Sequence, residues 1–392
     1  MRTWWLRIAG WGLVLVGCAD PAKETGTPPP PDSPFLHPET PGPFRAGNTS
    51  VFLQDDARTL SCAEGPRVLL TELWYPADAG GTENTVLDFF LGRWDEVVDA
   101  MGGDRDALTD LPTGSWRDAP LAADAPPMPV LVFSHGFLST RFQNYTMAAW
   151  LASHGYLVVA PDHTCNAQVA LTEDAVVVST DTNPFTALDD RVADVVFLLD
   201  LLTDHPPSLV DGRIDIAKIG LWGHSYGGVT ILETLKTETR PLAVMPMAAF
   251  GFPPMPDTLT ASSLHVWGMQ DAIVGTFEPW HDEVILQMPL PRYQLDFPDT
   301  GHFAFSDLCL FVPDMATQNG CGTNPTLDGL STFTNPDHDA LHAVLNAYAT
   351  AFFGATMLGE PDLVAWLEEN HFPDLMGYTA EAVAVQPAPY SL

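Results

Sequence analysis

The sequence is poor in basic residues and in cysteine. Its 392 residues contain 16 Lys and Arg against 50 Asp and Glu, which gives a formal net charge of −34 at pH 7. A surface this acidic repels phosphate backbones and argues against a nucleic-acid partner. The five cysteines are too few to form the dense disulfide framework that supports small secreted scaffolds. The chain is instead long and apolar enough for a full-sized hydrophobic core.

The N-terminal apolar segment lacks the length of a transmembrane helix. Two arginines precede a short apolar run, Ile8–Val16, which is too short to span a bilayer stably, so we predict a signal peptide over residues 1–17. The run ends at Gly17 and Cys18 in a pattern that resembles the bacterial lipobox, in which the cysteine is acylated after cleavage. An ordinary signal peptide with a coincidental cysteine is the alternative. We expect lipidation of Cys18 and an exported bacterial lipoprotein of the cell envelope, anchored in a membrane on the periplasmic face or at the cell surface.

A proline-rich segment follows this signal. Residues 28–31 are four consecutive prolines, and the residues around them are largely polar. Such a composition cannot build a core and favours a semi-rigid, extended tether. We therefore predict a lipidated tether over residues 18–43 and a folded domain over residues 44–392, with an insertion at about 80–129.

The body of the chain alternates between strand-like and helix-like segments. Short apolar runs without polar alternation are typical of strands buried on both faces, and they occur at residues 68–75, 130–134, 156–160, 218–222, 242–247, 263–268 and 292–297. Helical spacing is found at residues 142–154, 187–202, 226–237, 337–353 and 361–370. This order predicts an α/β fold with a mostly parallel central sheet and helices on both faces. Residues 80–129 are expected to be irregular apart from a short helix near 85–100.

The most specific motif is Gly223-His224-Ser225-Tyr226-Gly227. It matches G-x-S-x-G between a strand and a helix, the context in which this motif presents a nucleophilic serine on a tight turn. The two glycines are needed because a Cβ at either position would collide with neighbouring backbone. A glycine-rich turn with a chance serine is the alternative. We predict that Ser225 is the nucleophile.

A serine hydroxyl needs a histidine base that is oriented by a carboxylate. In this type of fold the chain order is serine, acid, histidine. His302 follows the strand at 292–297 and is flanked by Gly301, so we predict it as the base. Asp271 follows the strand that ends at Gly268 and is the predicted acid, although a turn-forming role would explain it equally well. Asp296 and Asp299 are closer to His302 in sequence and are the competing acids.

The other histidines are assigned structural or surface roles. His163 and His265 flank or occupy strands, and His224 is expected to point away from the reacting atoms. His338 and His342 have the i, i+4 spacing of a helical pair but lack the Glu of a zinc motif, so a solvated helix face is predicted. We expect no metal and no cofactor.

Acyl transfer also needs hydrogen-bond donors for an oxyanion. We expect the backbone N–H groups of Tyr226, the residue after the nucleophile, and of Phe137, in the turn after the strand at 130–134. We also predict that Phe137, Tyr226, Trp267 and Phe303 line the substrate pocket. Core packing is the alternative for these aromatic residues, and for Trp267 the two interpretations are evenly balanced.

With these residues in place the chain resembles the α/β-hydrolase fold. The segments at 130–163 and 218–228 are similar to platelet-activating-factor acetylhydrolases and to cutinase-like polyester hydrolases, and the resemblance covers about residues 44–353. It implies a calcium-independent serine esterase or lipase without a cofactor. In the acetylhydrolase pattern the acid follows the strand after the nucleophile helix, but the strand at 242–247 carries no carboxylate. The acid then comes from the next strand loop, as in polyester hydrolases, which favours Asp271.

The expected function is cleavage of carboxylic esters by a Ser-His-Asp triad through an acyl-enzyme. The substrate would be an apolar ester of lipid, short-acyl or polyester type. The alternatives are a catalytically inactive binding lipoprotein of the same fold, or a hydrolase of this fold that acts on amide bonds. Export permits disulfides. We predict a Cys309–Cys321 bond that holds the segment after His302, and a Cys62–Cys165 bond, with four free thiols as the alternative.

Overall fold

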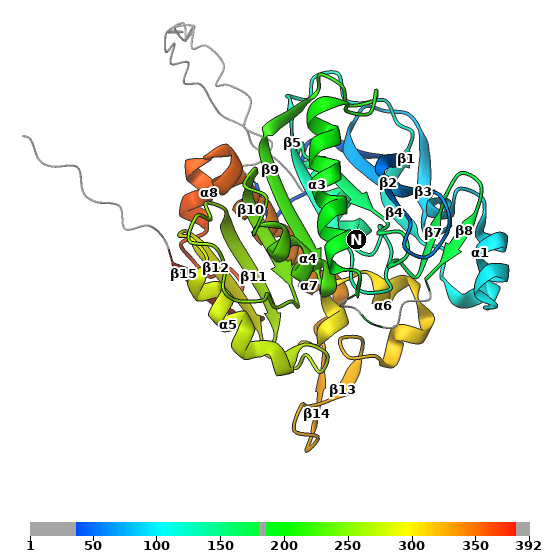
Figure 1. The fold of residues 1–392 in the computed structure, drawn as a ribbon. Helices are drawn as coiled ribbons and strands as arrows, with labels where there is room; N and C mark the ends of the chain where they lie inside the picture. Colours follow the sequence, from blue (N-terminus) through cyan, green and yellow to red (C-terminus); the bar gives the residue numbers. More distant parts are fainter. Residues whose placement is uncertain (1–36, 180–182, 184–185, 382–392) are drawn as a thin grey trace, which may run out of the picture. The chain divides into compact units, whose positions relative to one another are not determined.

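The computed structural model describes residues 37–179, 183 and 186–381. The predicted signal peptide, Cys18 and most of the predicted tether lie outside the described residues. The centre of the fold is an 11-stranded sheet in the order β15-β12-β11-β10-β9-β5-β6-β2-β1-β4-β3 (Figure 1). Its strands are β1 (Arg45–Thr59), β2 (Pro66–Ala77), β3 (Thr82–Thr85), β4 (Pro112–Arg117), β5 (Met128–Ser134), β6 (Leu157–Pro161), β9 (Ile214–His224), β10 (Pro241–Met247), β11 (Ser262–Gly268), β12 (Arg292–Phe297) and β15 (Gly377–Glu381).

The middle of the sheet is parallel. Neighbouring strands from β6 through β5, β9, β10 and β11 to β12 all pair in parallel, whereas β2 pairs antiparallel with β6 and β15 pairs antiparallel with β12. Parallel neighbours need crossover connections; helices lie in these connections except between β10 and β11, which a loop joins. The predicted α/β architecture with a mostly parallel central sheet is confirmed.

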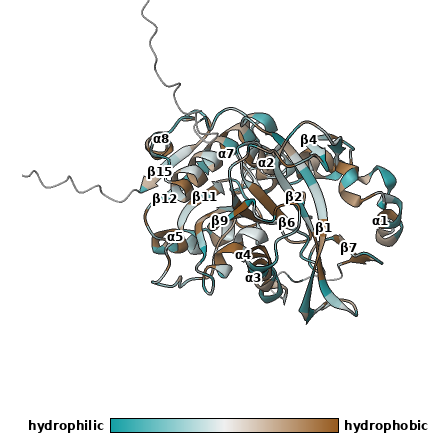
Figure 2. Cartoon of the chain, turned by 90° about the horizontal axis from the view of Figure 1, so that it is seen from above, coloured by the Kyte–Doolittle hydropathy of each residue, from teal (hydrophilic) through white to brown (hydrophobic). Residues whose placement is uncertain are grey.

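Helices cover both faces of the sheet, as Figure 2 shows from above. One face packs against α2 (Tyr145–Ser153), α7 (His338–Phe353) and α8 (Pro361–Trp366). The other packs against α3 (Leu188–Asp204), α4 (Tyr226–Thr234) and α5 (Glu278–Gln287). Two short helices, α1 (Trp94–Met101) and α6 (Leu308–Phe311), lie outside these layers near the carboxyl ends of the strands. Each face therefore has its own hydrophobic core.

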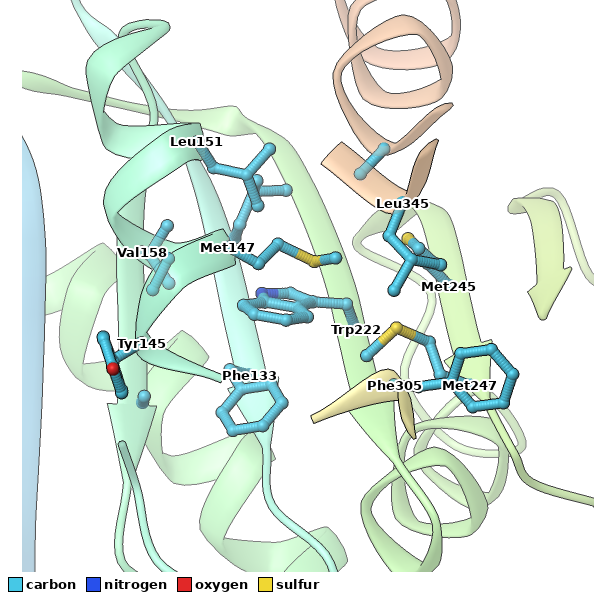
Figure 3. Close-up of a cluster of buried hydrophobic side chains, with 14 of the residues drawn as sticks. Phe133, Tyr145, Met147, Leu151, Val158, Trp222, Met245, Met247, Phe305 and Leu345 are labelled. Carbon is cyan, nitrogen blue, oxygen red and sulfur yellow. The ribbon is translucent and has the colours of Figure 1, made fainter. Parts of the chain in front are cut away.

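The core on the α2 face surrounds Trp222 of β9 (Figure 3). Met147 of α2 and Met245 of β10 belong to the same buried cluster, and the ring of Phe133 lies 4.3 Å from the Trp222 ring. Trp222 is fully buried and stands three residues before Ser225. The strand that carries Ser225 is therefore held by packing from its neighbours and from a helix layer.

One stretch of the described residues, His338–Leu358, is long and apolar enough to cross a membrane, and 83% of its apolar 18-residue window is buried inside the protein. It comprises α7 and a following π-helical turn, Gly354–Leu358. This burial is what a core helix shows.

Several elements differ from the prediction. The region at 80–129 contains the short helix expected near 85–100, as a 3-10 turn at Val86–Phe90 followed by α1, but it is otherwise less irregular than expected, because it also contains β3 and β4. β1 was not predicted, since its residues are partly exposed and contain no continuous apolar run. α5 was also not predicted. It has Pro279 in its first turn, and its apolar side chains are few. The small hairpins β7 (Val169–Leu171) with β8 (Val176–Val178), and β13 (Thr323–Pro325) with β14 (Thr332–Thr334), complete the fold.

Candidate active site

Ser225 lies on a sharp turn between β9 and α4. Its backbone has φ 56° and ψ −125°, a left-handed conformation that non-glycine residues rarely adopt and that marks a functional constraint. A Cβ on Gly223 would lie 2.6 Å from the carbonyl carbon of Gly227, and a Cβ on Gly227 would overlap the carbonyl oxygen of Ser134. The turn therefore requires both glycines and raises the Ser225 side chain at the N-terminus of α4.

The structure brings the three predicted side chains into one hydrogen-bonded chain. His302 Nε2 lies 2.8 Å from Ser225 Oγ, and His302 Nδ1 lies 2.7 Å from Asp271 Oδ2. His302 and Asp271 are buried, and Ser225 is partly exposed. Because an ionised carboxylate can only accept, Asp271 holds the proton of His302 on Nδ1 and leaves Nε2 free to accept the hydroxyl proton.

The Asp271 carboxylate is fixed in its ionised form. Its Oδ1 accepts hydrogen bonds from the amides of Ile273 at 2.8 Å and Val274 at 2.9 Å. Burial alone would raise the pKa of Asp271, but the neighbouring His302 and these amides lower it below its ordinary value. Asp296, one of the competing acids, receives a hydrogen bond from Gln294 at 2.8 Å. Asp271 is thus the carboxylate that orients His302.

The turn after β5 lies beside Ser225, because a Cβ on Gly136 would be 3.5 Å from the Ser225 Cβ. The Gly136 carbonyl accepts from His135 Nδ1 at 2.7 Å and from the Ser139 amide at 3.2 Å. In a planar trans peptide the next N–H points the opposite way, and among the described residues the Phe137 N–H donates no hydrogen bond. Gly136, Phe137 and Ser225 line one cavity. Phe137 therefore has a free backbone donor at the cavity that Ser225 lines, and Tyr226 follows Ser225 at the first position of α4.

A buried arginine donates hydrogen bonds to the turn after β5. Arg191 of α3 donates to the Ser134 hydroxyl at 3.1 Å, to Asn166 Oδ1 at 2.5 Å and to the His135 carbonyl. Burial lowers the pKa of Arg191 to about 9, so the guanidinium stays charged at neutral pH. Sequence reasoning missed this residue, because α3 shows only an apolar helical pattern.

Gln143 and His224 connect the turn at Gly136, the turn that carries Ser225 and the loop that carries His302. The Gly136 amide donates to Gln143 Oε1 at 2.7 Å, and Gln143 Nε2 lies 2.6 Å from His224 Nδ1. His224 Nε2 lies 2.9 Å from the His302 carbonyl. Burial and the neighbouring His302 lower the pKa of His224 to about 3, so its ring is neutral. It then accepts on Nδ1 and donates on Nε2, and this chain ties the Gly136 turn to the His302 loop.

Asn319 links the acid loop to the histidine loop. Its Oδ1 accepts from the amides of His302 at 2.7 Å and Ala272 at 3.1 Å, and its Nδ2 donates to the Gln270 carbonyl at 3.0 Å. No motif around Asn319 signals this role, because all three partners are backbone groups that are distant in the sequence.

Both predicted disulfides are confirmed. Cys62 and Cys165 are bonded with their Cα atoms 5.5 Å apart, and Cys309 and Cys321 are bonded with theirs 5.6 Å apart. The second bond closes the segment that contains Asn319. The closed loop therefore includes the residue whose side chain accepts a hydrogen bond from the His302 amide.

An apolar cavity of about 360 Å³ opens at Ser225. One wall comes from the region at 80–129, the other from the segment after His302. Phe137 and Phe303 line the cavity, as predicted, but Tyr226 and Trp267 do not. Trp267 instead stacks on His281, with ring centroids 4.2 Å apart, because its strand directs it into a separate buried cluster. The apolar lining outside the predicted set includes Phe90, Trp94, Val97, Val98, Met101, Leu108, Phe142, Leu308, Phe311, Val312 and Met315.

The predicted solvated face for His338 and His342 is wrong. His342 is 3% exposed, and the side chains of both residues lie within 4.0 Å of the buried carboxylate of Asp307. Within the described ranges, Asp307, His338 and His342 form the one group of three or more His, Cys, Asp or Glu side chains whose ligand atoms lie close enough to hold a metal ion. The sequence spacing of the two histidines was visible, but their third partner lies 31 residues before His338.

Known proteins resemble the chain in sequence and in fold. A family model for platelet-activating factor acetylhydrolase, isoform II, matches residues 72–180. A probable 1-alkyl-2-acetylglycerophosphocholine esterase of Arthroderma benhamiae is 26% identical over 232 residues, which is 53% of this chain and 57% of that protein. The match thus spans a little over half of this curated relative.

A solved structure, the ferulic acid esterase from Streptomyces cinnamoneus, superposes with a TM-score of 0.67 at 24% identity. The superposition covers 86% of this chain and 96% of the other. This likeness, together with the parallel sheet, confirms the predicted α/β-hydrolase fold.

Proposed function

We propose that the protein is a serine hydrolase that cleaves carboxylic ester bonds. The observation that carries the proposal is the hydrogen-bonded chain from Ser225 Oγ through His302 to Asp271 Oδ2. These distances lie in the range that general base catalysis requires. The similar proteins described above, which are named as an acetylhydrolase and as esterases, support the same bond type.

The residues divide the reaction into two acyl transfers. His302 Nε2 takes the proton of Ser225 as Oγ attacks the ester carbonyl carbon, and the oxyanion accepts hydrogen bonds from the Phe137 and Tyr226 amides. The carbonyl re-forms as the alkoxide leaves with the proton from His302. Water then attacks the acyl-enzyme with His302 as base again, which releases the acid and restores Ser225.

The cavity favours an ester with an apolar group on one side of the bond. Its volume of about 360 Å³ lies at the lower end of the range for small-molecule pockets, roughly 300–1,000 Å³. The cavity walls are mainly aromatic and aliphatic. A medium-length acyl chain or a single aromatic acid fits this description, and it supports lipid-like or aryl esters over highly polar substrates.

The alternatives receive less support. An inactive binding protein of this fold has no need of an oriented imidazole within 2.8 Å of the hydroxyl of a strained serine. An amidase would need the same triad, so bond type must be decided by substrate assay rather than by geometry.

Labelling and mutation test the proposal together. A fluorophosphonate probe should label Ser225, and Ser225→Ala should abolish labelling and lower kcat on p-nitrophenyl esters by at least about 10³-fold. Circular dichroism should show an unchanged fold. Ester turnover by Ser225→Ala at the wild-type rate would refute the assignment. A panel of anilides beside the esters distinguishes amide from ester cleavage.

We also propose that the enzyme is held at a membrane through an acylated Cys18. The proposal rests on the apolar run that ends at Gly17 and on the proline-rich segment after it. Mass spectrometry of the mature N-terminus in a bacterial host, with and without globomycin, tests it. An unmodified or missing Cys18 in the mature protein would contradict it.

A further inference from the structure

We propose that Asp307, His338 and His342 bind a zinc ion. The three residues come from two parts of the chain: Asp307 follows the short 3-10 turn His302–Phe305, and the two histidines occupy the first turns of α7. The site is separate from the ester-cleaving residues, and the inference does not depend on the proposed activity.

Two of the three distances between the ligand atoms match the spacing of a zinc site. Asp307 Oδ1 lies 3.1 Å from His338 Nε2 and 3.5 Å from His342 Nδ1, and the three ligand atoms all lie within 4.8 Å of one another. Zinc bonds of about 2.0–2.1 Å in tetrahedral geometry place neighbouring ligand atoms roughly 3.3 Å apart. An ion can therefore be accommodated between the three atoms with small side-chain movements.

In the neutral His342 ring the hydrogen lies on Nε2, and the lone pair of Nδ1 points at the Asp307 carboxylate. Its Nε2 lies 3.1 Å from the Ala304 carbonyl oxygen, which can only accept, so this nitrogen carries the hydrogen. In the neutral ring Nδ1 is then an acceptor, and it faces Asp307 Oδ1, another acceptor. A cation between the two atoms removes this conflict.

Thr146 does not resolve the conflict, because it has a single hydroxyl hydrogen. Its Oγ1 lies 2.6 Å from Asp307 Oδ1 and 3.4 Å from His342 Nδ1, so the hydrogen belongs to the shorter bond. The Thr146 amide also donates to Asp307 Oδ2 at 2.8 Å. Thr146 thus orients the carboxylate and leaves His342 Nδ1 without a donor.

His338, on the solvent side of the cluster, also has one ring nitrogen near Asp307 and the other near a possible hydrogen-bond acceptor. Its Nδ1 lies 3.3 Å from Asp339 Oδ1, and a hydrogen on Nδ1 leaves Nε2 as the acceptor that faces Asp307. Histidines that ligate metals commonly donate their second ring N–H to a carboxylate or a backbone carbonyl; His342 has the Ala304 carbonyl as this partner, and Asp339 is within reach of His338 for the same role. The His338 side chain is 15% exposed, so an ion and a water ligand can reach the site from this side.

The donor set selects among cations. Two imidazole nitrogens and one carboxylate suit zinc, whereas calcium and magnesium prefer sites made wholly of oxygen. A bound ion would connect the start of α7 to the segment behind His302, because Asp307 and Ala304 both belong to that segment. We therefore assign the ion a structural role.

Metal analysis and thermal unfolding of the full chain test the site. Protein stripped with pyridine-2,6-dicarboxylate should rebind one zinc per chain, measured by mass spectrometry of the eluted metal. Zinc at about 100 times Kd should raise Tm by about 3–5 °C. Replacement by Co²⁺ should give the visible absorption of a tetrahedral ion.

Two histidine variants provide the comparison. His338→Gln, chosen because His338 is partly exposed and the variant should fold, should lose the zinc, the Co²⁺ spectrum and the Tm increase. His205→Gln removes an exposed histidine at the end of α3 and should behave as wild type. Equal zinc binding by wild type and His338→Gln, or a wild-type Tm that ignores zinc, would overturn the proposal. A Tm that depends on pH but not on zinc would also overturn it, because the cluster would then share only a proton.

Discussion

At the residue scale, the backbone amide and carbonyl of His302 are both hydrogen-bonded, as are both nitrogens of its ring. Asn319 Oδ1 accepts from the His302 amide, while His224 donates to the His302 carbonyl. Asn319 also contacts both sides of Asp271 through the Gln270 carbonyl and the Ala272 amide. The distance between imidazole and carboxylate therefore depends on a residue that touches neither side chain.

Asn319→Ala should lower kcat by about 10- to 100-fold with little change in KM, since misplacement of a catalytic group by about 1 Å costs about that much. The apparent pKa of the kcat/KM profile should also shift, which a purely structural defect would not cause. Gln318→Ala, an exposed neighbour, is the control. Wild-type kcat and an unchanged pH profile in Asn319→Ala would show that the contact does not position His302.

His265 is a buried histidine that the active site does not use. It is fully buried in β11, and among the described residues neither ring nitrogen has a hydrogen-bond partner. Burial, with smaller effects from His281 and Arg292, holds the pKa of His265 well below its usual range. The native ring stays neutral, whereas in the unfolded chain it takes up a proton below about pH 6.5. Its contribution to stability therefore falls as the pH falls below 6.5.

His265→Leu removes this penalty. The free energy of unfolding of the variant relative to wild type should be about 2 kcal/mol higher at pH 5 than at pH 8, because only the wild-type unfolded state gains a proton at this position. Urea unfolding at both pH values measures the difference, and the value at pH 8 controls for packing. The same difference at pH 5 and pH 8 would show that His265 does not titrate on unfolding.

Local sequence patterns predicted Ser225 and His302 but not the residues that hold them in place. Ser225 could be found because its glycines and strand lie within a few residues of it, and His302 because it directly follows a buried strand. Gln143 and Asn319 were not predicted, since their partners, which are backbone groups and the His224 ring, are brought close to them only by the folded chain. Trp267 was placed in the wrong cluster because strand alternation alone does not say which buried group a side chain joins.

At the scale of elements, the region at 80–129 builds one wall of the cavity. Val97 and Val98 of α1 are buried and line it, while Asp99 on the same helix is exposed. The sequence predicted a short helix near 85–100 in an otherwise irregular segment, and α1 lies at that place with its apolar side facing the cavity. α1 therefore limits the cavity on this side, and we expect it to limit the length of the substrate.

Val98→Trp should fill part of the cavity. We expect kcat/KM for a p-nitrophenyl ester with a medium-length acyl chain to fall at least about 10-fold, while the acetate ester changes little, because a lost methylene contact costs about 1–3 kcal/mol in such pockets. Asp99→Ala is the matched control. A parallel loss on both esters would indicate damage to the triad rather than a shorter pocket.

At the scale of the whole molecule, the two disulfides close loops of very different length. Cys62–Cys165 spans 103 residues and Cys309–Cys321 spans 12. In the chain-entropy account the longer loop restricts the unfolded chain more, and the two bonds contribute about 4.7 and about 3 kcal/mol.

The double variant Cys62→Ser/Cys165→Ser should therefore lose more stability than Cys309→Ser/Cys321→Ser, by about 1.5–2 kcal/mol. Chemical unfolding of the oxidised proteins measures both. Activity should show the opposite order, because the shorter loop carries Asn319. Greater loss of stability in the shorter-loop variant would mean that native packing, rather than the unfolded chain, dominates.

Both outer strands of the large sheet are short and polar. β3 has four residues, and β15 has five and runs antiparallel to β12. Glu83 lies in the first, and Glu381 of the second pairs with Arg292 at 2.6 Å. Short edge strands like these expose few backbone N–H and C=O groups for pairing with a strand of a second molecule, and their charged side chains oppose such pairing. Crowded copies of this protein should remain separate rather than polymerise edge to edge into fibrils.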